Sequence, residues 1–276
     1  MKRARGFTLL EMVLVIVIMG IMAASFTVFF KPAIDGYFDA RRRAELTDTA
    51  DTALRRIGRE VRRAVPNSIR IPGSACFEFV PTKSGGLYRR AADIVNANSD
   101  PLDTTGADAG FDVLSPLASA PAAGDFIVIG NQNTNDVYAG TTRGTVSAWA
   151  SPPAPGGALV GVGRVTLAAA TQFPAGYDGG RFQVVDANEQ SVFYICDGAG
   201  SLMRLVRPFT PASAACPPTA GAVPLATNVA SCEFVYNPNQ GVAGTQQSGF
   251  LWVRIELLSG GERMALTHGV HVSNVP

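Results

Sequence analysis

One carboxylate lies at the start of the longest apolar run in the chain. Glu11 is the only charged residue between Phe7 and Phe30, and residues 12–30 are uncharged. An unpaired carboxylate in hydrocarbon costs roughly 2.5–3.5 kcal/mol on insertion scales. Glu11 therefore needs a partner that offsets this cost, or a specific role of its own.

Candidate metal ligands are few. The stretch 96–112 carries oxygen ligands of the kind that bind Ca²⁺, namely Asp100, Asp103, Asp108 and Asp112. Their spacing fits no EF-hand, and a polar loop explains them as well. His268 and His271 are three apart in a predicted strand, so they point to opposite faces and a shared metal is disfavoured. We expect no metal and no other cofactor.

Enzyme motifs are missing from the sequence. It contains no G-x-S-x-G nucleophile elbow, and the glycine-rich stretch 157–163 matches no phosphate loop and opens no predicted helix. The sequence therefore indicates a protein that is not an enzyme. Its formal net charge of +1 also gives no global basic balance that would favour nucleic acid.

Four cysteines indicate disulfides if the body is exported. Cys76, Cys196, Cys216 and Cys232 include no C-x-x-C pair and allow three connectivities. The alternative is four buried reduced thiols. Cys76 and Cys232 each open a predicted strand, so we expect them to link neighbouring strands. Cys196 and Cys216 would then close a loop of about twenty residues, worth roughly 3 kcal/mol.

The element that positions Glu11 is a predicted membrane-spanning helix. Three of the first five residues are basic, so the positive-inside rule keeps this end cytoplasmic and exports the remainder. Residues 12–30 span about 28 Å as a helix, enough for the hydrocarbon core. A cleaved secretory signal with its cut at 22–25 is disfavoured by Glu11 and by the apolar residues beyond the cut. A plain membrane anchor leaves Glu11 unexplained.

The segment "GFTLLEM" at 6–12 resembles the prepilin motif of type IV pilins, pseudopilins and related filament proteins. The resemblance implies that a prepilin peptidase cuts after Gly6 and that the new N-terminal residue, Phe7, is methylated. Glu11 is then expected to pair with the freed amine of Phe7 on a neighbouring subunit. Such a pair would make assembly favourable and fix the register of the packed helices. Alternatively, Glu11 only marks the peptidase substrate.

The apolar helix is predicted to continue, beyond a bend, as an amphipathic helix into the body. We expect a bend near Pro32–Gly36, and an end at Pro66-Asn67. One face carries an apolar stripe that should pack on a sheet. It consists of Leu54, Ile57, Val61 and Val65, extended backward by Tyr37, Ala40, Ala44 and Thr47. The other face is basic: Arg41, Arg42, Arg43, Arg55, Arg56, Arg59, Arg62 and Arg63. We favour a solvated face that pairs with neighbouring subunits; contacts with DNA or lipid head groups are the alternatives.

From residue 66 onward the sequence consists of short β-type runs separated by turns. The predicted strands are 76–80, 125–130, 145–150, 159–168, 181–186, 191–196, 202–207, 232–237, 250–258 and 263–268. The last two flank a hairpin turn at 259–262, and apolar residues alternate along 250–258 as in a half-buried antiparallel strand. The predicted loops are 91–124, 151–157 and 208–224. The fold class is α+β, with a long N-terminal helix packed on an antiparallel β-sheet body.

Two further segments resemble one subfamily. Residues 53–71 and 261–276 are similar to the MshO-type minor pilins of the mannose-sensitive haemagglutinin pilus, which are related to J-type pseudopilins of type II secretion. The resemblance implies a minor pilin that primes or caps a filament, with other pilins, the prepilin peptidase and the inner membrane as partners. A type II secretion pseudopilin and a DNA- or surface-binding pilus tip protein are the alternatives.

The expected organisation has four parts. These are a cleaved basic leader (1–6), a transmembrane and assembly helix (7–30), an amphipathic helix (31–65) and a β-rich periplasmic or extracellular body (66–276). The chain is expected to cross the inner membrane once and then to enter a pilus, at its tip.

Overall fold

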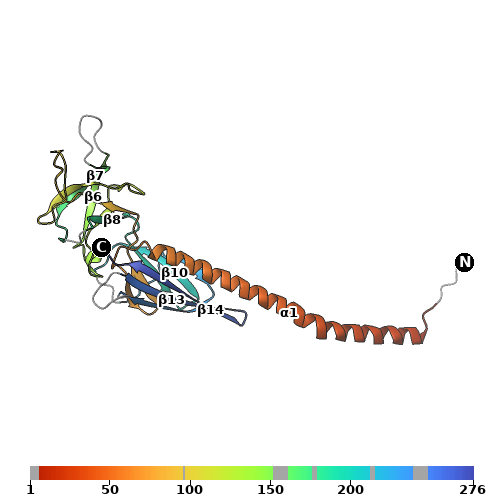
Figure 1. Ribbon diagram of the computed structural model, residues 1–276. Coiled ribbons are helices and arrows are strands. Elements are labelled where there is room, and N and C mark those ends of the chain that lie inside the picture. Colours follow the sequence, from red (N-terminus) through yellow and green to blue (C-terminus); the bar gives the residue numbers. More distant parts are fainter. Residues whose placement is uncertain (1–5, 96, 152–160, 176–178, 212–214, 239–247) are drawn as a thin grey trace.

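The computed structural model describes residues 6–95, 97–151, 161–175, 179–211, 215–238 and 248–276. Helix α1 (Leu9–Val61) has 53 residues, which corresponds to about 80 Å. Within the described ranges it is the one helix that is long and apolar enough to cross a membrane. Its N-terminal half projects away from the molecule, whereas its C-terminal half lies on β-strands (Figure 1).

Helix α1 continues through Pro32. Figure 1 shows a bend between its projecting part and the part on the strands, in keeping with the hydrogen bond that a proline removes. The helix ends at Val61, before the predicted end at Pro66-Asn67. It ends early because the chain turns to pair with a strand segment: the Val65 amide donates to the Val80 carbonyl at 2.8 Å.

Two antiparallel sheets form the body. The five-stranded sheet has the order β1-β2-β9-β10-β11 and the three-stranded sheet the order β12-β13-β14. The five strands are β1 (Arg70–Gly73), β2 (Cys76–Phe79), β9 (Ser191–Cys196), β10 (Ser201–Arg207) and β11 (Val223–Thr227). The other three are β12 (Val229–Asn237), β13 (Ser248–Ser259) and β14 (Glu262–Ser273).

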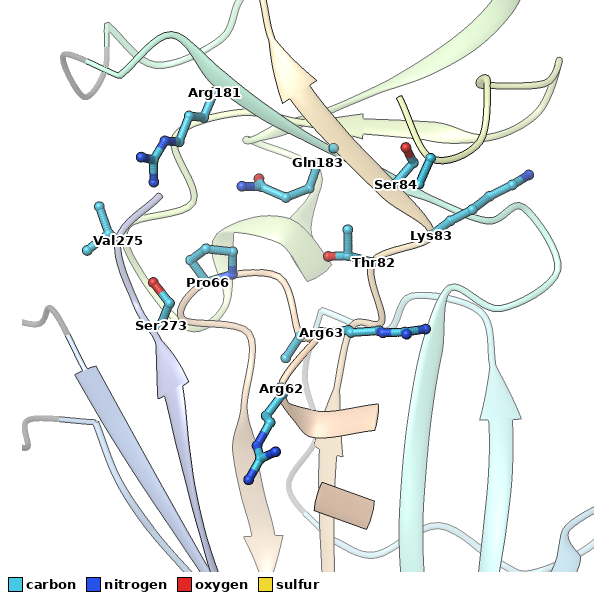
Figure 2. Close-up of a pocket in the computed structure, with 13 residues that line it drawn as sticks. Arg62, Arg63, Pro66, Thr82, Lys83, Ser84, Arg181, Gln183, Ser273 and Val275 are labelled. Atoms are coloured by element: carbon cyan, nitrogen blue, oxygen red, sulfur yellow. The ribbon is translucent and has the colours of Figure 1, made fainter. Parts of the chain in front are cut away.

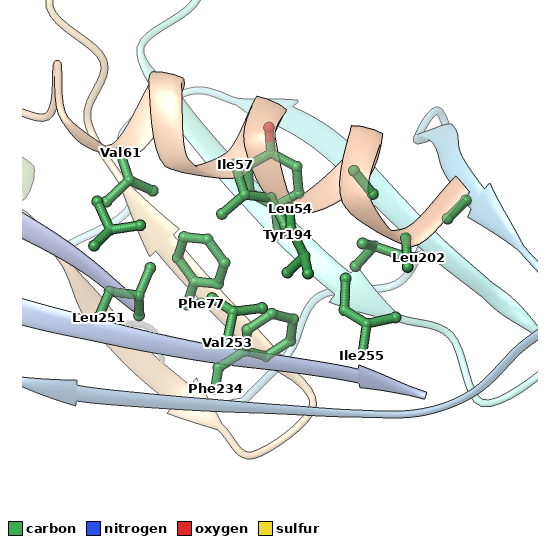
Figure 3. Close-up of a cluster of buried hydrophobic side chains, with 14 of the residues drawn as sticks. Leu54, Ile57, Val61, Phe77, Tyr194, Leu202, Phe234, Leu251, Val253 and Ile255 are labelled. Carbon is green, nitrogen blue, oxygen red and sulfur yellow. The ribbon is translucent and has the colours of Figure 1, made fainter. Parts of the chain in front are cut away.

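Helix α1 and both sheets share one core. Buried α1 residues are Leu46, Ala50, Ala53, Leu54, Ile57, Gly58 and Val61, which confirms the predicted stripe at Leu54, Ile57 and Val61. Its predicted backward extension is wrong, because Tyr37, Ala40 and Ala44 are exposed and lie before Leu46, the first buried residue of the helix. Figure 3 shows the α1 side chains above Phe77 and Tyr194 of the five-stranded sheet and Phe234 and Val253 of the three-stranded sheet. The fold is therefore α+β, as predicted.

The β13–β14 hairpin follows its sequence pattern. Leu251, Val253, Ile255 and Leu257 are fully buried on one face of β13, as their alternation predicts. Ser259 pairs with Glu262 across a two-residue turn. Gly260 and Gly261 both have positive φ, +57° and +85°, which glycine adopts at no steric cost.

A six-stranded barrel is inserted between β2 and β9. Its order is β3-β8-β5-β6-β7-β4, and an antiparallel bridge between Tyr88 and Val113 joins the two edges and closes the ring. The strands are β3 (Ser84–Leu87), β4 (Asp108–Val113), β5 (Phe126–Val128), β6 (Arg143–Ala150), β7 (Gly163–Thr171) and β8 (Arg181–Val185). The short helix α2 (Asp136–Ala139) connects β5 to β6. The barrel lies at the end of the molecule opposite the projecting half of α1 (Figure 1).

Buried contacts fix the barrel on the body. Arg70 of β1 pairs with the buried carboxylate of Glu78 at 2.5 Å, and its guanidinium lies 3.6 Å from the centre of the Tyr138 ring of α2. Burial raises the pKa of Glu78, although Arg70 and Ser191 donate hydrogen bonds to it. This contact ties the five-stranded sheet to the inserted segment.

Some predicted loops contain strands. The predicted loop 91–124 includes β4, and 208–224 includes the start of β11. Strand β4 carries two aspartates and a glycine, so its sequence is not typical of a strand, and its pairing partner β7 lies some 50 residues away. The short strands β1 and β3 were not predicted either, because both contain glycine and β1 also contains a proline.

Two disulfides form, but the predicted pairing is wrong. The bonds are Cys76–Cys216 and Cys196–Cys232. Cys76 and Cys232 lie on strands of different sheets, so they are not on neighbouring strands. Cys196–Cys232 instead links the two sheets. Cys76–Cys216 holds the segment after β10 against the face of the five-stranded sheet that is turned away from α1.

Candidate assembly site at the start of the apolar helix

Glu11 closes the first turn of α1. The Glu11 amide donates to Thr8 Oγ1 at 3.3 Å, and the Thr8 amide donates to Glu11 Oε2 at 3.5 Å. The two residues form a reciprocal capping box, which gives the Thr8 amide a partner in the Glu11 carboxylate. Glu11 therefore points back toward the residue that precedes Thr8, which is Phe7.

Thr8 was not among the residues that the sequence indicated. The signal was present as a T-x-x-E pattern directly before an apolar run, which is typical of a helix N-terminus. The capping box adds a local role for Glu11, because a carboxylate in the first turn also interacts favourably with the helix dipole. In the chain itself, the contacts of Glu11 use only Oε2; Oε1 accepts no hydrogen bond from a described residue.

No described residue of the body covers the apolar half of α1. From Leu9 onward, the first buried residue of the helix is Leu46, and the large apolar residues before it are exposed. Phe7, for example, is 77% exposed and Ile18 is 47% exposed. An apolar surface of this length needs hydrocarbon or other helices against it. The helix thus fits a membrane anchor.

The basic face of α1 is largely paired within the chain. Five of its arginines have carboxylate partners: Arg41–Glu45, Arg42–Asp39, Arg43–Glu262, Arg55–Asp51 and Arg56–Glu60. The Arg43–Glu262 pair joins α1 to the β13–β14 turn at 2.7 Å. Arg59, Arg62 and Arg63 have no ion pair with a described residue. This distribution supports a solvated face more than a continuous surface for DNA.

Glu60 connects the basic face to the five-stranded sheet. Its carboxylate accepts hydrogen bonds from Arg56 at 3.0 Å and from Arg204 of β10 at 2.9 Å. Burial acts to raise the pKa of Glu60, but the two arginines outweigh burial and hold this pKa below its ordinary value. Burial also raises the pKa of Tyr194, which lies beside Glu60.

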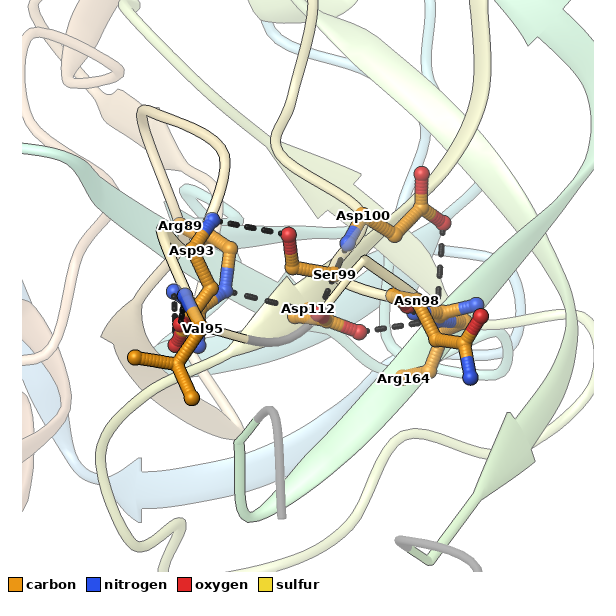
Figure 4. Close-up of polar contacts among 8 residues, drawn as sticks. All are labelled: Arg89, Asp93, Val95, Asn98, Ser99, Asp100, Asp112 and Arg164. Atoms are coloured by element: carbon orange, nitrogen blue, oxygen red, sulfur yellow. Dashed lines mark hydrogen bonds and ion pairs between the residues drawn. The ribbon is translucent and has the colours of Figure 1, made fainter. Parts of the chain in front are cut away.

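The aspartates of 96–112 serve as acceptors for arginines and backbone amides (Figure 4). Asp112 accepts from Arg164 at 2.7 Å and from the Asp100 amide at 2.8 Å, and Arg89 lies 3.4 Å from the same carboxylate. Asp108 accepts from the amide of Asp103 at 2.7 Å. Among the described residues no group of three His, Cys, Asp or Glu side chains is arranged to hold a metal ion.

The two histidines lie on β14 and are directed to different faces. The ring of His271 lies 4.9 Å from that of Phe250 on the outer face of the three-stranded sheet. His268 faces α1, where a Cβ added to Gly58 would lie 2.8 Å from its Nε2 atom. The glycine lets the helix approach the strand closely at this point.

The N-terminal segment also matches a family model. Residues 1–27 match the prokaryotic N-terminal methylation motif. No curated protein and no solved structure matches the chain. The motif supports a type IV pilin-like protein, a structural class that implies processing by a prepilin peptidase and assembly with other pilins. It covers Gly6, Phe7, Thr8 and Glu11 and does not reach the body.

Proposed function

We propose that the chain is a minor pilin subunit that primes or caps a type IV filament of the mannose-sensitive haemagglutinin type. The observation that carries the proposal is a methylation motif at residues 1–27 on a helix whose apolar half is uncovered. Lipid covers this half before assembly, and the equivalent helices of other subunits cover it afterwards. The resemblance of residues 53–71 and 261–276 to MshO-type minor pilins supports the same assignment.

Cleavage after Gly6 creates a cationic group that can pair with Glu11. The cut gives Phe7 a free α-amine, four residues from Glu11. Because Oε1 of Glu11 accepts no hydrogen bond from a described residue, it remains available to the Phe7 ammonium of a neighbouring subunit. Each added subunit then compensates a carboxylate that would otherwise stay unpaired in an apolar bundle. The pair also fixes the axial register between helices.

The shape of the chain supports a terminal position in the filament. The barrel adds bulk at the end opposite the projecting helix (Figure 1). Such a body is awkward to repeat along a thin filament and fits at its tip. In this proposal residues 1–6 are the leader, 7–30 the transmembrane and assembly helix, and 31–65 the amphipathic helix, while 66–276 face the periplasm or the exterior.

The first experiment is to express the full chain in bacterial membranes with and without a prepilin peptidase. We expect intact mass and N-terminal sequencing to give a chain that begins at methylated Phe7 only when the peptidase is present. A chain that begins near Ser25, or that is never cut, would refute the proposal.

The second experiment compares Glu11→Ala with the control Glu45→Ala, which changes an exposed glutamate of the same helix. We expect both variants to be cut and only Glu11→Ala to be depleted from sheared filaments. Normal incorporation of Glu11→Ala would contradict the pairing with Phe7. Recovery with a type II secretion complex instead of pili would identify the chain as a pseudopilin.

A further inference from the structure

A groove of about 520 Å³ lies at the junction of body and barrel (Figure 2). The C-terminal end of α1 and the residues after it form one wall, and β3 and β8 of the barrel form another. The end of β14 contributes Ser273, and the segment after it contributes Val275. Its volume lies within the range of about 300–1,000 Å³ that ligand pockets occupy. The groove therefore has room for more than a single ion.

The lining of this groove carries positive charge, and none of its described residues is acidic. Its cations are Arg62, Arg63, Lys83 and Arg181. Lys83 is compensated, because it pairs with Asp125 at 3.0 Å and with Asp186 at 3.1 Å. Arg62, Arg63 and Arg181 have no ion pair with any described residue. Three guanidinium groups thus border one groove without a counter-charge from the described part of the chain.

Neutral hydrogen-bonding groups lie between these arginines. The side chains of Thr82, Gln183 and Ser273 line the groove and make no hydrogen bond with a described residue. Pro66, Ala118 and Val275 add apolar surface to the same lining. The groove therefore offers cationic, polar and apolar contacts together, as a binding site for a polypeptide does.

The arrangement of the arginines indicates the class of ligand. Figure 2 shows that the guanidinium groups of Arg62, Arg63 and Arg181 lie apart from one another at the edges of the groove and point in different directions. A single phosphate or carboxylate would reach only part of this set, whereas an extended chain with several anionic groups can reach all of it. None of the described lining residues is aromatic, so they offer a single-stranded nucleic acid no surface on which to stack its bases.

We propose that this groove binds an acidic polypeptide segment of a neighbouring filament subunit. The inference rests on the proposed function, because that function places other subunits against this chain. Carboxylates of the segment pair with Arg62, Arg63 and Arg181, and its backbone meets Gln183 and Ser273. Since both the body and the barrel contribute arginines, the occupant contacts both units at once and recognises this subunit by the junction between them.

The test measures binding of a fluorescein-labelled hexaglutamate peptide to the full-length chain in detergent micelles by fluorescence anisotropy. We expect saturable binding that weakens with salt, and no binding of a hexaglutamine peptide. Arg62→Gln and Arg181→Gln should each weaken binding about 5-fold or more, as expected when a charge-assisted contact of at least about 1 kcal/mol is lost. The matched control Arg59→Gln changes an exposed, unpaired arginine of the same helix outside the groove, and should change the affinity less than 2-fold.

Three results would overturn the proposal. The first is that the hexaglutamate peptide shows no saturable binding. The second is that Arg59→Gln weakens binding as much as Arg62→Gln or Arg181→Gln does. The third is that hexathymidine or inorganic phosphate, at the same charge concentration, displaces the peptide. Urea unfolding of each variant confirms that the fold is kept. Because the assay needs no peptidase, a chain that binds the peptide but is never cut after Gly6 refutes only the filament function. A chain that is cut and assembled but binds no peptide refutes only the groove.

Discussion

Replacement of Ile57 by alanine tests whether the C-terminal half of α1 is part of the folded body. Ile57 is 0% exposed and belongs to the core that also contains Phe77 and Val253. The substitution removes three carbon groups, which contribute about 0.8 kcal/mol each, or about 2.4 kcal/mol together. The cavity left behind adds to this loss, so we expect the free energy of unfolding to fall by about 3–4 kcal/mol.

The two tryptophans give a clean assay for this change. Trp149 lies on β6 of the barrel and Trp252 on β13 of the body. In a Trp149→Phe background, the fluorescence of Trp252 therefore reports unfolding of the body alone. With an m-value of about 2.5 kcal/mol per M, Ile57→Ala should lower the urea midpoint of the full chain in micelles by about 1.2–1.6 M.

Ile18→Ala is the matched control, because Ile18 lies in the projecting half of the same helix and is 47% exposed. We expect its midpoint to stay within about 0.2 M of the parent, since no described residue of the body covers this side chain. Equal shifts for the two variants would show that α1 does not divide into an integrated half and a free half. A shift below about 0.3 M for Ile57→Ala would show that the helix does not contribute to the core.

Four further predictions concern the bonds that hold the body together. Mass spectrometry of a non-reducing digest should show peptides linked by Cys76–Cys216 and by Cys196–Cys232. Trypsin leaves Cys216 and Cys232 on one peptide, so a second protease must cut between them. Any other pairing contradicts the structure. Cys76–Cys216 has a sequence separation of 140 and Cys196–Cys232 one of 36. In the chain-entropy model, removal of the first bond should lower the free energy of unfolding by about 5 kcal/mol and removal of the second by about 4 kcal/mol, as measured by urea unfolding. Because the pKa of Glu60 is held below its ordinary value, its contribution to stability is present at neutral pH and is lost as pH falls through that pKa. The urea midpoint of Glu60→Gln should therefore fall less between pH 6 and pH 3 than the midpoint of the parent. An equal fall would exclude this carboxylate as a source of acid sensitivity. Arg70→Ala leaves the carboxylate of Glu78 buried without its cation and should lower the free energy of unfolding by about 3–5 kcal/mol. The double variant Arg70→Met with Glu78→Leu removes both charges and should lower it less. A double variant as unstable as Arg70→Ala would argue against an unpaired charge as the cause.

The features that could be predicted from the sequence are those set by local pattern. The first half of α1 follows from an apolar run that lasts to Phe30, and the buried face of β13 follows from strict alternation between Leu251 and Leu257. The hairpin turn at Gly260 and Gly261 needs only the positive φ values that glycine permits. The role expected of Glu11 likewise rests on its position relative to Gly6 and Phe7.

The features that could not be predicted depend on contacts between distant segments. The barrel closes through Tyr88 and Val113, and neither residue signals this bridge in its own stretch of sequence. The disulfide pairing is set by which sheet carries each cysteine, and sheet membership follows from strand pairing over more than 100 residues. Thr8 is an exception among the residues that were not predicted, because its capping pattern with Glu11 can be recognised in the local sequence.

The way in which the barrel is inserted allows it to vary separately from the rest of the chain. Phe79 and Val192 are paired neighbours on β2 and β9, so the inserted segment leaves and re-enters the body at adjacent positions. A domain attached in this way can be lengthened, shortened or exchanged for another with adjacent ends while α1 and its contacts with β13 and β14 stay the same. The inserted barrel and the part of the molecule that carries the apolar helix can therefore diversify independently of each other.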